Sequence, residues 1–434
     1  MQNEFDVQNS EISAMKKTRS TTVWYAVSLI AVALISAVIT FLVTSTFGMN
    51  DRLNGGFGRE FDVIDKYIDD YAYYDADHEA MRDAALKAYV AASGDRYTIY
   101  YNAEDFSAHN EYNEGRYVGI GVTVTVESVE YLGEILSLLK IIKVTETSSA
   151  YEKGIIEGDL IYSFHTDSEE LFTNDVGVDV IASKIKGEEG TEVTLSLLRE
   201  ENDGYRKIDV TLERRKVEVK SVSYTTYEGR SDIGVVTISQ FDMNTPRLLS
   251  ETFDELSSQG ISKAVIDMRD NGGGDLNSVV ACASYFLNED DPIISAEDNR
   301  GNVVKYNTRV RTYGGVYSSC SVTREDIGKY KSFDLVVLVN ENTASAAELL
   351  TAVFRDYELA LIVGVNTFGK GTMQTIYSLE PVGLEGGIKI TTDVYFPPCG
   401  ENYDGVGILP DVVVENDESD VDNQLQTAVE QLVK

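Results

Sequence analysis

Residues 230–415 alternate apolar, β-branched runs with amphipathic segments, and this alternation constrains the fold more than any other feature of the chain. Four of the runs predict buried strands: 233–238, 264–268, 335–339 and 359–363. Helices are expected after the first three runs, at Thr245–Gly260, Asp275–Leu287 and Ala344–Tyr357. Strands that alternate with helices imply right-handed βαβ crossovers and a mostly parallel sheet. Sites in such sheets form in loops at the carboxyl ends of the strands.

The first of these helices has a predicted start. Thr245 is expected to be its N-cap, because the next residue is Pro246 and proline suits the first helical position. Leu249, Phe253 and Leu256 recur at helical spacing and are expected to line its inner face.

The turn after the third predicted strand presents Ser345 in or near the first turn of a helix. The first N–H groups of a helix have no internal partner and carry partial positive charge. A serine there lies beside ready-made donors for an oxyanion. A helix start built from small residues for packing explains the same segment, and on this segment alone that structural explanation is the stronger one.

Lys370 lies between two glycines just after the fourth predicted strand. A free lysine has a pKa near 10.4, so a general base at neutral pH needs a pKa lowered by roughly 2–3, which burial can supply. If residues 372–379 are extended, Lys370 and Gln374 point to the same side. The neutral Gln374 amide could then orient the amine. Taken singly, the two residues are as simply explained as a solvated loop lysine and an exposed strand glutamine.

Two other kinds of site fit this region less well. Gly364 to Lys370 nearly matches a phosphate-binding loop, but that motif needs Ser or Thr directly after Lys and then a helix. Gly371 follows instead, and the next stretch alternates like a strand. A Ser-His-Asp triad needs a histidine, and none of the three histidines (His78, His109, His165) lies in residues 230–415.

Composition excludes several function classes. The formal net charge of −35 makes nucleic acid an unsuitable partner, because phosphate binding needs clustered Lys and Arg. The three cysteines are scattered and odd in number, which argues against a disulfide framework. Neither a CxxC nor an HExxH pattern is present, so no metal site is expected.

An uncharged stretch near the N-terminus, Val23 to Phe47, is long enough to span a membrane as a helix. Lys16, Lys17 and Arg19 precede it, so the positive-inside tendency keeps residues 1–22 in the cytoplasm and the catalytic part outside. A cleaved signal peptide is the competing interpretation, but its apolar region is usually about 7–15 residues. We therefore expect a single-pass protein retained in the cell membrane.

Three segments in the core carry a resemblance to the carboxyl-terminal processing proteases, also called tail-specific proteases. They are MRDNGGGDL (268–276), VLVNENTASAAELL (337–350) and VGVNTFGKGTMQ (363–374). The segments at 389–400 and 405–411 resemble that family's closing strands, and the similarity spans about residues 57–415. Each motif is weak alone, whereas the ordered set is specific.

The resemblance implies a role for each residue of the proposed site. Ser345 would be the nucleophile, Lys370 the general base and Gln374 the orienting residue, and no cofactor is implied. Backbone N–H groups of Gly273 and Ala346 would hold the oxyanion. The family's usual proline is Gly272 here and one asparagine is Asp270, departures that leave the loop more flexible.

The resemblance also identifies residues 117–220, a run of short predicted strands, as a PDZ-like module. Its carboxylate-binding loop would comprise Val118, Gly119, Ile120 and Gly121, followed by a strand edge that pairs with an extended peptide. A simple hairpin glycine pair explains the same loop. A short helix is expected at Val178–Lys186, and an insertion near Ser128–Leu139 departs from a short PDZ hairpin.

The predicted architecture is a multidomain α+β and α/β protein. Its parts are a cytoplasmic N-terminus, a transmembrane anchor, a helical N-terminal region, a β-rich PDZ-like domain, a serine protease core and a C-terminal segment, at 1–22, 23–47, 57–112, 117–220, 221–415 and 416–434. The expected function is endopeptidase cleavage of extracytoplasmic polypeptides near their C-termini. A non-catalytic PDZ-type peptide-binding protein and an acyl-transfer enzyme with non-peptide substrates remain alternatives, and a homo-oligomer stays open.

Overall fold

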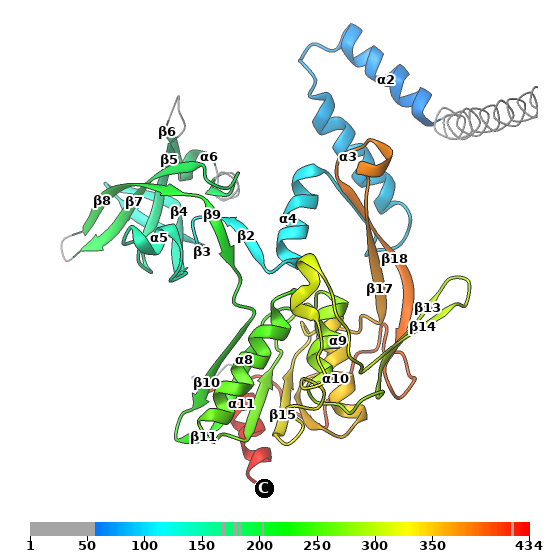
Figure 1. Ribbon diagram of the computed structural model, residues 1–434. Coiled ribbons are helices and arrows are strands. Elements are labelled where there is room, and N and C mark those ends of the chain that lie inside the picture. The colour runs from blue at the N-terminus through cyan, green and yellow to red at the C-terminus, as the bar shows by residue number, and fades with distance from the viewer. Residues whose placement is uncertain (1–56, 166–169, 177–180, 182–184, 202–203, 418–420) are drawn as a thin grey trace, which may run out of the picture. The chain divides into compact units, whose positions relative to one another are not determined.

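The computed structural model describes residues 57–165, 170–176, 181, 185–201, 204–417 and 421–434 (Figure 1). The predicted anchor at 23–47 and most of the predicted helix at 178–186 lie outside these residues. In the part that is described, no helix is both long enough and apolar enough to cross a membrane. Contacts within the chain divide it into two units. The first unit ends at Leu86, and the second begins at Lys87.

The first unit contains helix α2 (Phe57–Tyr71) and the first part of α3 (His78–Ala91). The Asp77 side chain accepts the Ala80 N–H at 2.9 Å, and such a bond caps the start of a helix. His78 joins the two helices, because its ring contacts Asp69 of α2 at 2.8 Å.

The centre of the second unit is a six-stranded sheet in the order β10-β11-β12-β15-β16-β19. The strands are Val222–Tyr227, Arg230–Ile238, Lys263–Asp267, Asp334–Val339, Ala360–Gly364 and Val412–Val413. Only the β10–β11 pair is antiparallel, and the other four pairs are parallel. The four strands predicted from the sequence are all present, and the mostly parallel sheet is confirmed.

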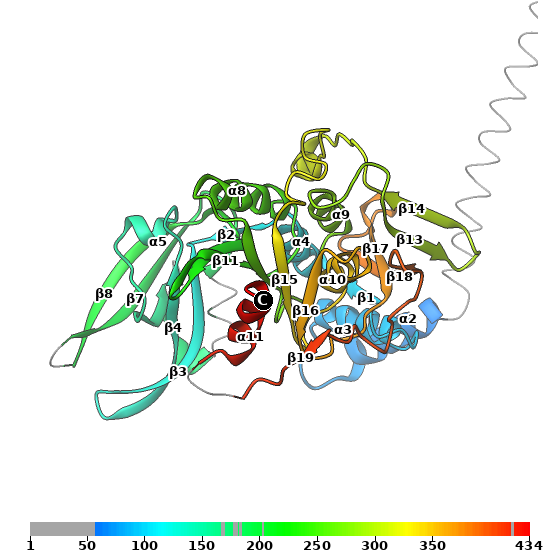
Figure 2. The same ribbon diagram turned by 90° about the horizontal axis from the view of Figure 1, so that it is seen from below.

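Helices cover both faces of this sheet. Helices α8 (Thr245–Ser258), α9 (Leu276–Ser284) and α10 (Ala346–Asp356) share one buried core with alternate strand residues such as Ile266 and Val337. The residues between them, such as Val265 and Val336, pack against α11 (Asn423–Leu432) on the other face. Figure 2 shows α11, in red, across the strands from α8 and α9. The alternation of buried side chains along each strand thus produces a three-layer core.

One predicted helix start is wrong by one residue. Asn244, not Thr245, is the N-cap of α8, and Thr245 is the first helical residue. The Thr245 hydroxyl is fully buried and bonds with Ser221 at 2.9 Å, while the Asp242 side chain accepts the Thr245 N–H at 3.0 Å. The neighbouring aspartate therefore provides the side-chain acceptor that we expected from Thr245.

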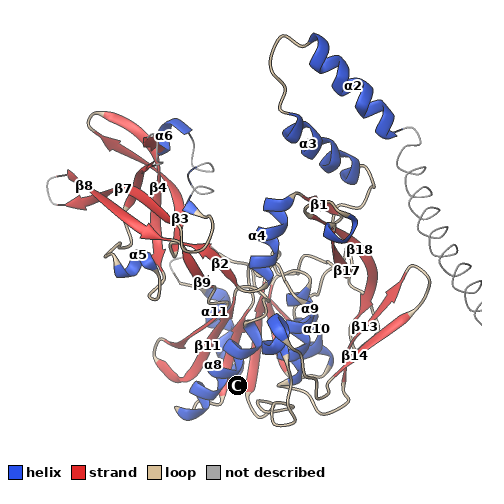
Figure 3. Cartoon of the chain, turned by 45° about the horizontal axis from the view of Figure 1, so that its top comes forward, coloured by secondary structure: helices blue, strands red, loops and turns tan. Residues whose placement is uncertain are grey.

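A second, antiparallel sheet carries the segment with Lys370 and was not predicted as a unit (Figure 3). Its strands are β1 (Ile99–Tyr101), β13 (Pro292–Asp298), β14 (Val303–Asn307), β17 (Thr372–Ser378) and β18 (Gly387–Phe396). Strand β1 interrupts the region expected to be helical, residues 57–112, and pairs with β18 along Ile99–Lys389 to Tyr101–Gly387. This pairing brings residues from the start of the second unit to the Lys370 segment.

The expected PDZ-like region forms a separate β-rich module with its own buried core, which includes Ile120 and Leu195. Its sheet follows the order β3-β4-β5-β7-β8, with β6 beside β5, over Val122–Tyr131, Glu134–Val144, Leu160–His165, Glu192–Glu201, Gly204–Glu213 and Glu170–Phe172. Short helices α5 (Ser149–Glu152) and α6 (Thr173–Val176) accompany the sheet. The chain enters along β2 (Arg116–Gly119) and leaves along β9 (Arg215–Glu218), which pair with each other. The predicted insertion at 128–139 is the far end of a long β3–β4 hairpin that turns at Leu132–Gly133.

Candidate active site

Ser345 lies at the junction between β15 and α10, where it is the N-cap residue of the helix. Its backbone has φ 57° and ψ −118°, a conformation that side-chain-bearing residues rarely adopt and that stores strain of order 1–3 kcal/mol. The turn before it is held by Thr343, whose buried hydroxyl donates to the Met268 carbonyl at 2.9 Å. Strained serines at strand–helix turns present their hydroxyl to a cleft, which is what a nucleophile needs.

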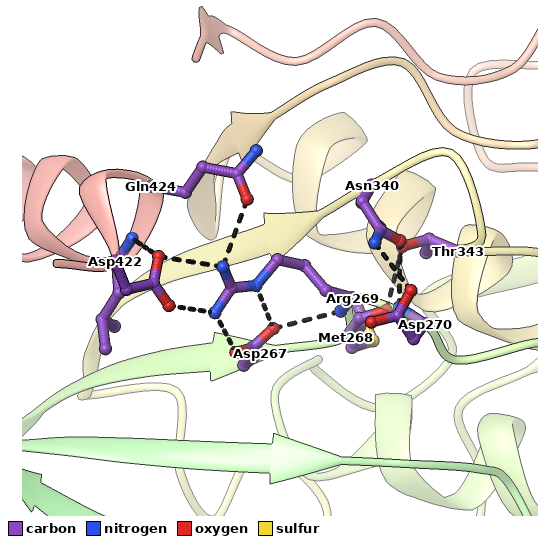
Figure 4. A network of polar contacts seen from close by, with 9 residues as sticks. Asp267, Met268, Arg269, Asp270, Asn340, Thr343, Asp422 and Gln424 are labelled. Carbon is purple, nitrogen blue, oxygen red and sulfur yellow. Dashed lines mark hydrogen bonds and ion pairs between the residues drawn. The ribbon is translucent and has the colours of Figure 1, made fainter. Parts of the chain in front are cut away.

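The loop after β12 lies against Ser345. Figure 4 shows Asp270 of this loop bonded to Asn340. Asp270 accepts the side-chain N–H groups of Asn340 at 2.9 Å and Asn342 at 2.8 Å. The buried Asn271 donates to the Ile238 carbonyl at 2.8 Å, and its own carbonyl accepts the Ala344 N–H at 2.9 Å. Asp270, which stands where the family has an asparagine, was expected to make the loop more flexible. It instead ties the loop to the turn that carries Ser345.

Gly273 is the point of closest approach between this loop and the candidate nucleophile. It has φ 100°, and a Cβ added there would lie 2.8 Å from the Ser345 Cβ and 2.9 Å from the Ala346 nitrogen. Only glycine can occupy this position without displacing the backbone. The Gly273 N–H donates to the Asn271 side chain at 2.9 Å, so it is already used within the loop. Ala346 is the first residue of α10, where a helix N–H has no intrahelical acceptor.

A fully buried carboxylate, that of Glu348, joins the Ser345 segment to the Lys370 segment. It accepts the backbone N–H of Ser345 at 2.9 Å and that of Lys370 at 2.8 Å. It also accepts the Gly369 N–H and the Thr367 hydroxyl, both at 2.6 Å. One side chain therefore fixes the backbones of both candidate catalytic residues.

We expect Glu348→Gln to lower kcat by about 100-fold, because misplacement of reacting groups by about 1 Å has that effect. The glutamine amide group would face donors that now meet carboxylate oxygens, so the free energy of unfolding should fall by about 2–4 kcal/mol. Steady-state kinetics and denaturant unfolding measure the two effects. Glu341→Gln is the matched control, since Glu341 is an exposed glutamate of the same turn and should change neither. A kcat equal to that of the wild type would refute the joining role of Glu348.

The Lys370 side chain is half-buried, and its surroundings favour a neutral amine. Burial lowers the pKa of Lys370 to about 8, assisted by the charge of Lys389 and opposed by that of Glu348. The Lys370 Nζ lies 4.7 Å from the centre of the Tyr97 ring. Tyr97 precedes the unpredicted strand β1, so the second sheet supplies part of the shelter.

Ser345, Lys370 and Gln374 all line one cavity of about 320 Å³, together with Gly273, Ala346 and apolar side chains such as Leu276, Leu349 and Met373. Within the described residues, no hydrogen bond joins Lys370 Nζ to Ser345 or to Gln374. The Gln374 amide instead donates to Thr372 at 3.1 Å and Thr391 at 3.2 Å. The β17–β18 register shifts between Met373 and Gln374, where Thr392 of β18 has no pairing partner, so the extra residue lies in β18 and not in β17. The predicted residues therefore share one cavity without forming a bonded triad.

The cavity is also lined by residues that were not predicted, among them His109, Lys389 and Tyr395. His109 lies on α4 (Ala103–Asn113), outside residues 230–415, the region in which the sequence has no histidine for a Ser-His-Asp triad. Burial lowers the pKa of His109, and Lys389 acts in the same direction. Tyr395 donates to the Lys370 carbonyl at 2.6 Å, and burial raises the pKa of its phenol. The pairing of β1 with β18, which brings these residues together, could not be detected in the sequence.

Comparison with known proteins finds similarity to one peptidase family. Residues 232–414 match the profile of peptidase family S41. A probable CtpA-like serine protease of Staphylococcus aureus (strain N315) is 28% identical over 413 residues, 94% of this chain and 76% of the relative. One from Staphylococcus saprophyticus is 28% identical over 418 residues, 95% of this chain and 77% of the relative.

A solved structure shows the same fold. The structure of a putative S41 protease from Bacteroides fragilis NCTC 9343 aligns with a TM-score of 0.51 at 14% identity, and covers 84% of this chain and 92% of that one. Over residues 232–414 the chain matches peptidase family S41, and over most of its length it is similar to the CtpA-like serine proteases, which confirms the resemblance found in the sequence.

Proposed function

We propose that this protein is a membrane-anchored serine endopeptidase in which Ser345 is the nucleophile and Lys370 the general base. The observation that carries the proposal is the Glu348 carboxylate, which binds the backbone of both residues and directs both segments to one cavity. Related serine proteases and the S41 domain support the reaction class. The sheltered amine supports the choice of base, because a general base works best with a pKa near the working pH.

In the proposed reaction the Ser345 oxygen attacks a peptide carbonyl and its proton passes to the Lys370 amine. The Ala346 N–H and the glycine loop stabilise the oxyanion. Gly273 can serve as the second donor only if its N–H exchanges Asn271 for the substrate oxygen. Lys370 then protonates the leaving amine, and the acyl group on Ser345 is hydrolysed by a water that Lys370 deprotonates.

This chemistry requires the Lys370 amine to move from the Tyr97 ring toward the Ser345 hydroxyl. Rotation about the lysine side-chain bonds accomplishes this without movement of the backbone, which Glu348 holds in place. Hydrogen bonds between catalytic groups are often long or absent without substrate and tighten when it binds. Gln374, in the same cavity, would orient the amine in that second position.

Polypeptide substrates would be guided by the PDZ-like module. Val118 and Gly119 belong to β2 and pair with β9, so the carboxylate-binding turn narrows to Ile120 and Gly121. No acceptor for the Ile120 or Gly121 N–H occurs among the residues that the structure describes. The next strand, β3, is the edge of its sheet and can accept an extended peptide as an added strand. The anchor at 23–47 would keep the catalytic part outside the cytoplasm.

Cleavage of unfolded casein by the purified full chain in detergent tests the proposal. We expect cleavage that stops when a serine-directed acylating inhibitor is added, with the inhibitor found on Ser345 by mass spectrometry. A non-catalytic peptide-binding protein would bind casein without cleaving it. An acyl-transfer enzyme would hydrolyse activated esters only. Either of these two results, or a label on a serine other than Ser345, would refute the proposal.

A further inference from the structure

The C-terminal helix α11 lies beyond residue 414, where the match to the S41 domain ends, yet it binds the loop next to Ser345. Arg269 is the connecting residue, and its side chain is only 18% exposed. Its guanidinium donates to both carboxylate oxygens of Asp422, at 3.0 and 2.7 Å, and to the Gln424 side chain at 3.1 Å. Figure 4 shows Asp422 and Gln424 converging on Arg269 from the helix.

The other partner of Arg269 lies at the end of β12, the strand that precedes it. Asp267, two residues earlier at the end of β12, accepts two bonds from the guanidinium, at 2.9 and 2.7 Å, and the Arg269 N–H at 3.1 Å. Asp267 therefore fixes the shape of the strand end. Asp422 lies 153 residues beyond Arg269 in the chain, so it fixes the strand end relative to another element. Bidentate Arg–carboxylate pairs define geometry as well as supplying energy.

Arg269 directly precedes the loop that approaches the nucleophile. The loop continues through Asp270 and Asn271 to Gly273, whose Cα position leaves no room for a Cβ beside Ser345. Such close packing transmits a displacement at Arg269 to the oxyanion donors. Asp270 and Asn271 hold the far side of the loop, and Asp422 holds the near side through Arg269.

Helix α11 is fastened at both ends. Asp422 is its N-cap residue and accepts the Leu425 N–H at 2.9 Å in addition to the Arg269 bonds. At the other end, Lys263 at the start of β12 donates to the Leu432 carbonyl at 2.8 Å. Ala428, Val429 and Leu432 pack against the sheet between these points. Each end of the helix is thus held by one polar contact, and of these two only the Asp422–Arg269 contact reaches the loop next to Ser345.

We propose that Asp422 is a positioning residue: through Arg269, the C-terminal helix sets the place of the Gly272–Gly273 loop over Ser345. The inference rests on the proposed function, because it assigns a catalytic consequence to that loop. It also extends the functional protease beyond the segment matched to the family.

The test compares Asp422→Ser, Asp422→Asn and Asp422→Glu with Lys263→Met in the full chain. Serine and asparagine both remain good N-cap residues, so they remove the ion pair without removing the cap. We expect Asp422→Ser and Asp422→Asn to lower kcat for a peptide substrate about 10-fold while KM changes less than 2-fold. Asp422→Glu should recover most of kcat. Lys263→Met, which frees the other end of the helix, should leave kcat unchanged.

Hydrogen exchange provides a second readout that does not depend on proteolysis. Amides of residues 270–274 should exchange faster in Asp422→Ser than in the wild type, and at the wild-type rate in Lys263→Met. Unchanged kcat and unchanged exchange in Asp422→Ser would overturn the inference. Equal losses in Asp422→Ser and Lys263→Met would also overturn it, because they would indicate general loosening of the helix. A wild-type protein without Ser345-dependent cleavage would refute the proposed function instead, while the exchange result would still decide the role of Asp422.

Discussion

Replacement of Ser345 by alanine is expected to lower kcat/KM for peptide cleavage by about 10⁴-fold or more, the scale seen when a serine nucleophile is removed. Ser345 lies in the cavity between the glycine loop and Lys370, and its hydroxyl is the only group lost. Alanine meets the same backbone restriction at φ 57°, so the free energy of unfolding should change by less than about 1 kcal/mol. Cleavage of a quenched fluorescent peptide and denaturant unfolding measure the two quantities.

Ser258→Ala is the control for that experiment. Ser258 is an exposed serine at the end of α8, and its hydroxyl donates only to the Glu255 carbonyl of its own helix. Its replacement should leave cleavage and stability unchanged. If Ser345→Ala cleaved the peptide as fast as Ser258→Ala, another group would have to be the nucleophile.

Replacement of Lys370 by methionine is expected to lower kcat by at least about 10³-fold and, at the same time, to stabilise the fold. Methionine keeps much of the side-chain length but cannot accept a proton. The pKa of Lys370 is lowered to about 8 in the folded protein, so a charged amine is unfavourable there. At pH 7 the variant should unfold with a free energy about 2–3 kcal/mol higher than the wild type, the energetic equivalent of that lowered pKa after allowance for partial exposure.

The sign of this stabilisation fixes its pH dependence. Below pH 8, Lys370 is charged in both the folded and the unfolded wild type, and the full cost of burying the charge is present. Between pH 8 and about 10.5 the folded state loses the proton first, so the wild type gains stability as pH rises. The advantage of Lys370→Met should therefore shrink across this interval and vanish above it. An advantage that grew with pH would contradict a lowered pKa.

The parallel core could be predicted because its strands are continuous apolar runs. Strands such as β15, buried on both faces between helix layers, leave that pattern in a single sequence. The order of the three motifs then indicated the family, which the S41 match confirmed. Local patterns were sufficient wherever the structure depends on neighbours in the chain.

The rest of the site depends on contacts between distant segments. Tyr97 approaches Lys370 only because β1 pairs with β18, nearly 290 residues later, and a three-residue strand has no periodicity to detect. Glu348 has the sequence context of an ordinary first-turn glutamate, and only its contacts with the Lys370 segment distinguish it. Arg269 and Asp422 are likewise joined across 153 residues. Sequence spacing carries no signal for such pairs, so these joining residues were missed.

The measurement that tests the central claim most directly is the pH dependence of Ser345 acylation by a fluorophosphonate, followed in the wild type and in Lys370→Met. If the neutral Lys370 amine activates Ser345, the wild-type rate should rise with pH through a midpoint near 8 and then level off. In Lys370→Met the rate should be at least about 100-fold lower and should lack this midpoint. A wild-type rate that does not change between pH 6 and about 10, or the same midpoint in both proteins, would contradict Lys370 as the base.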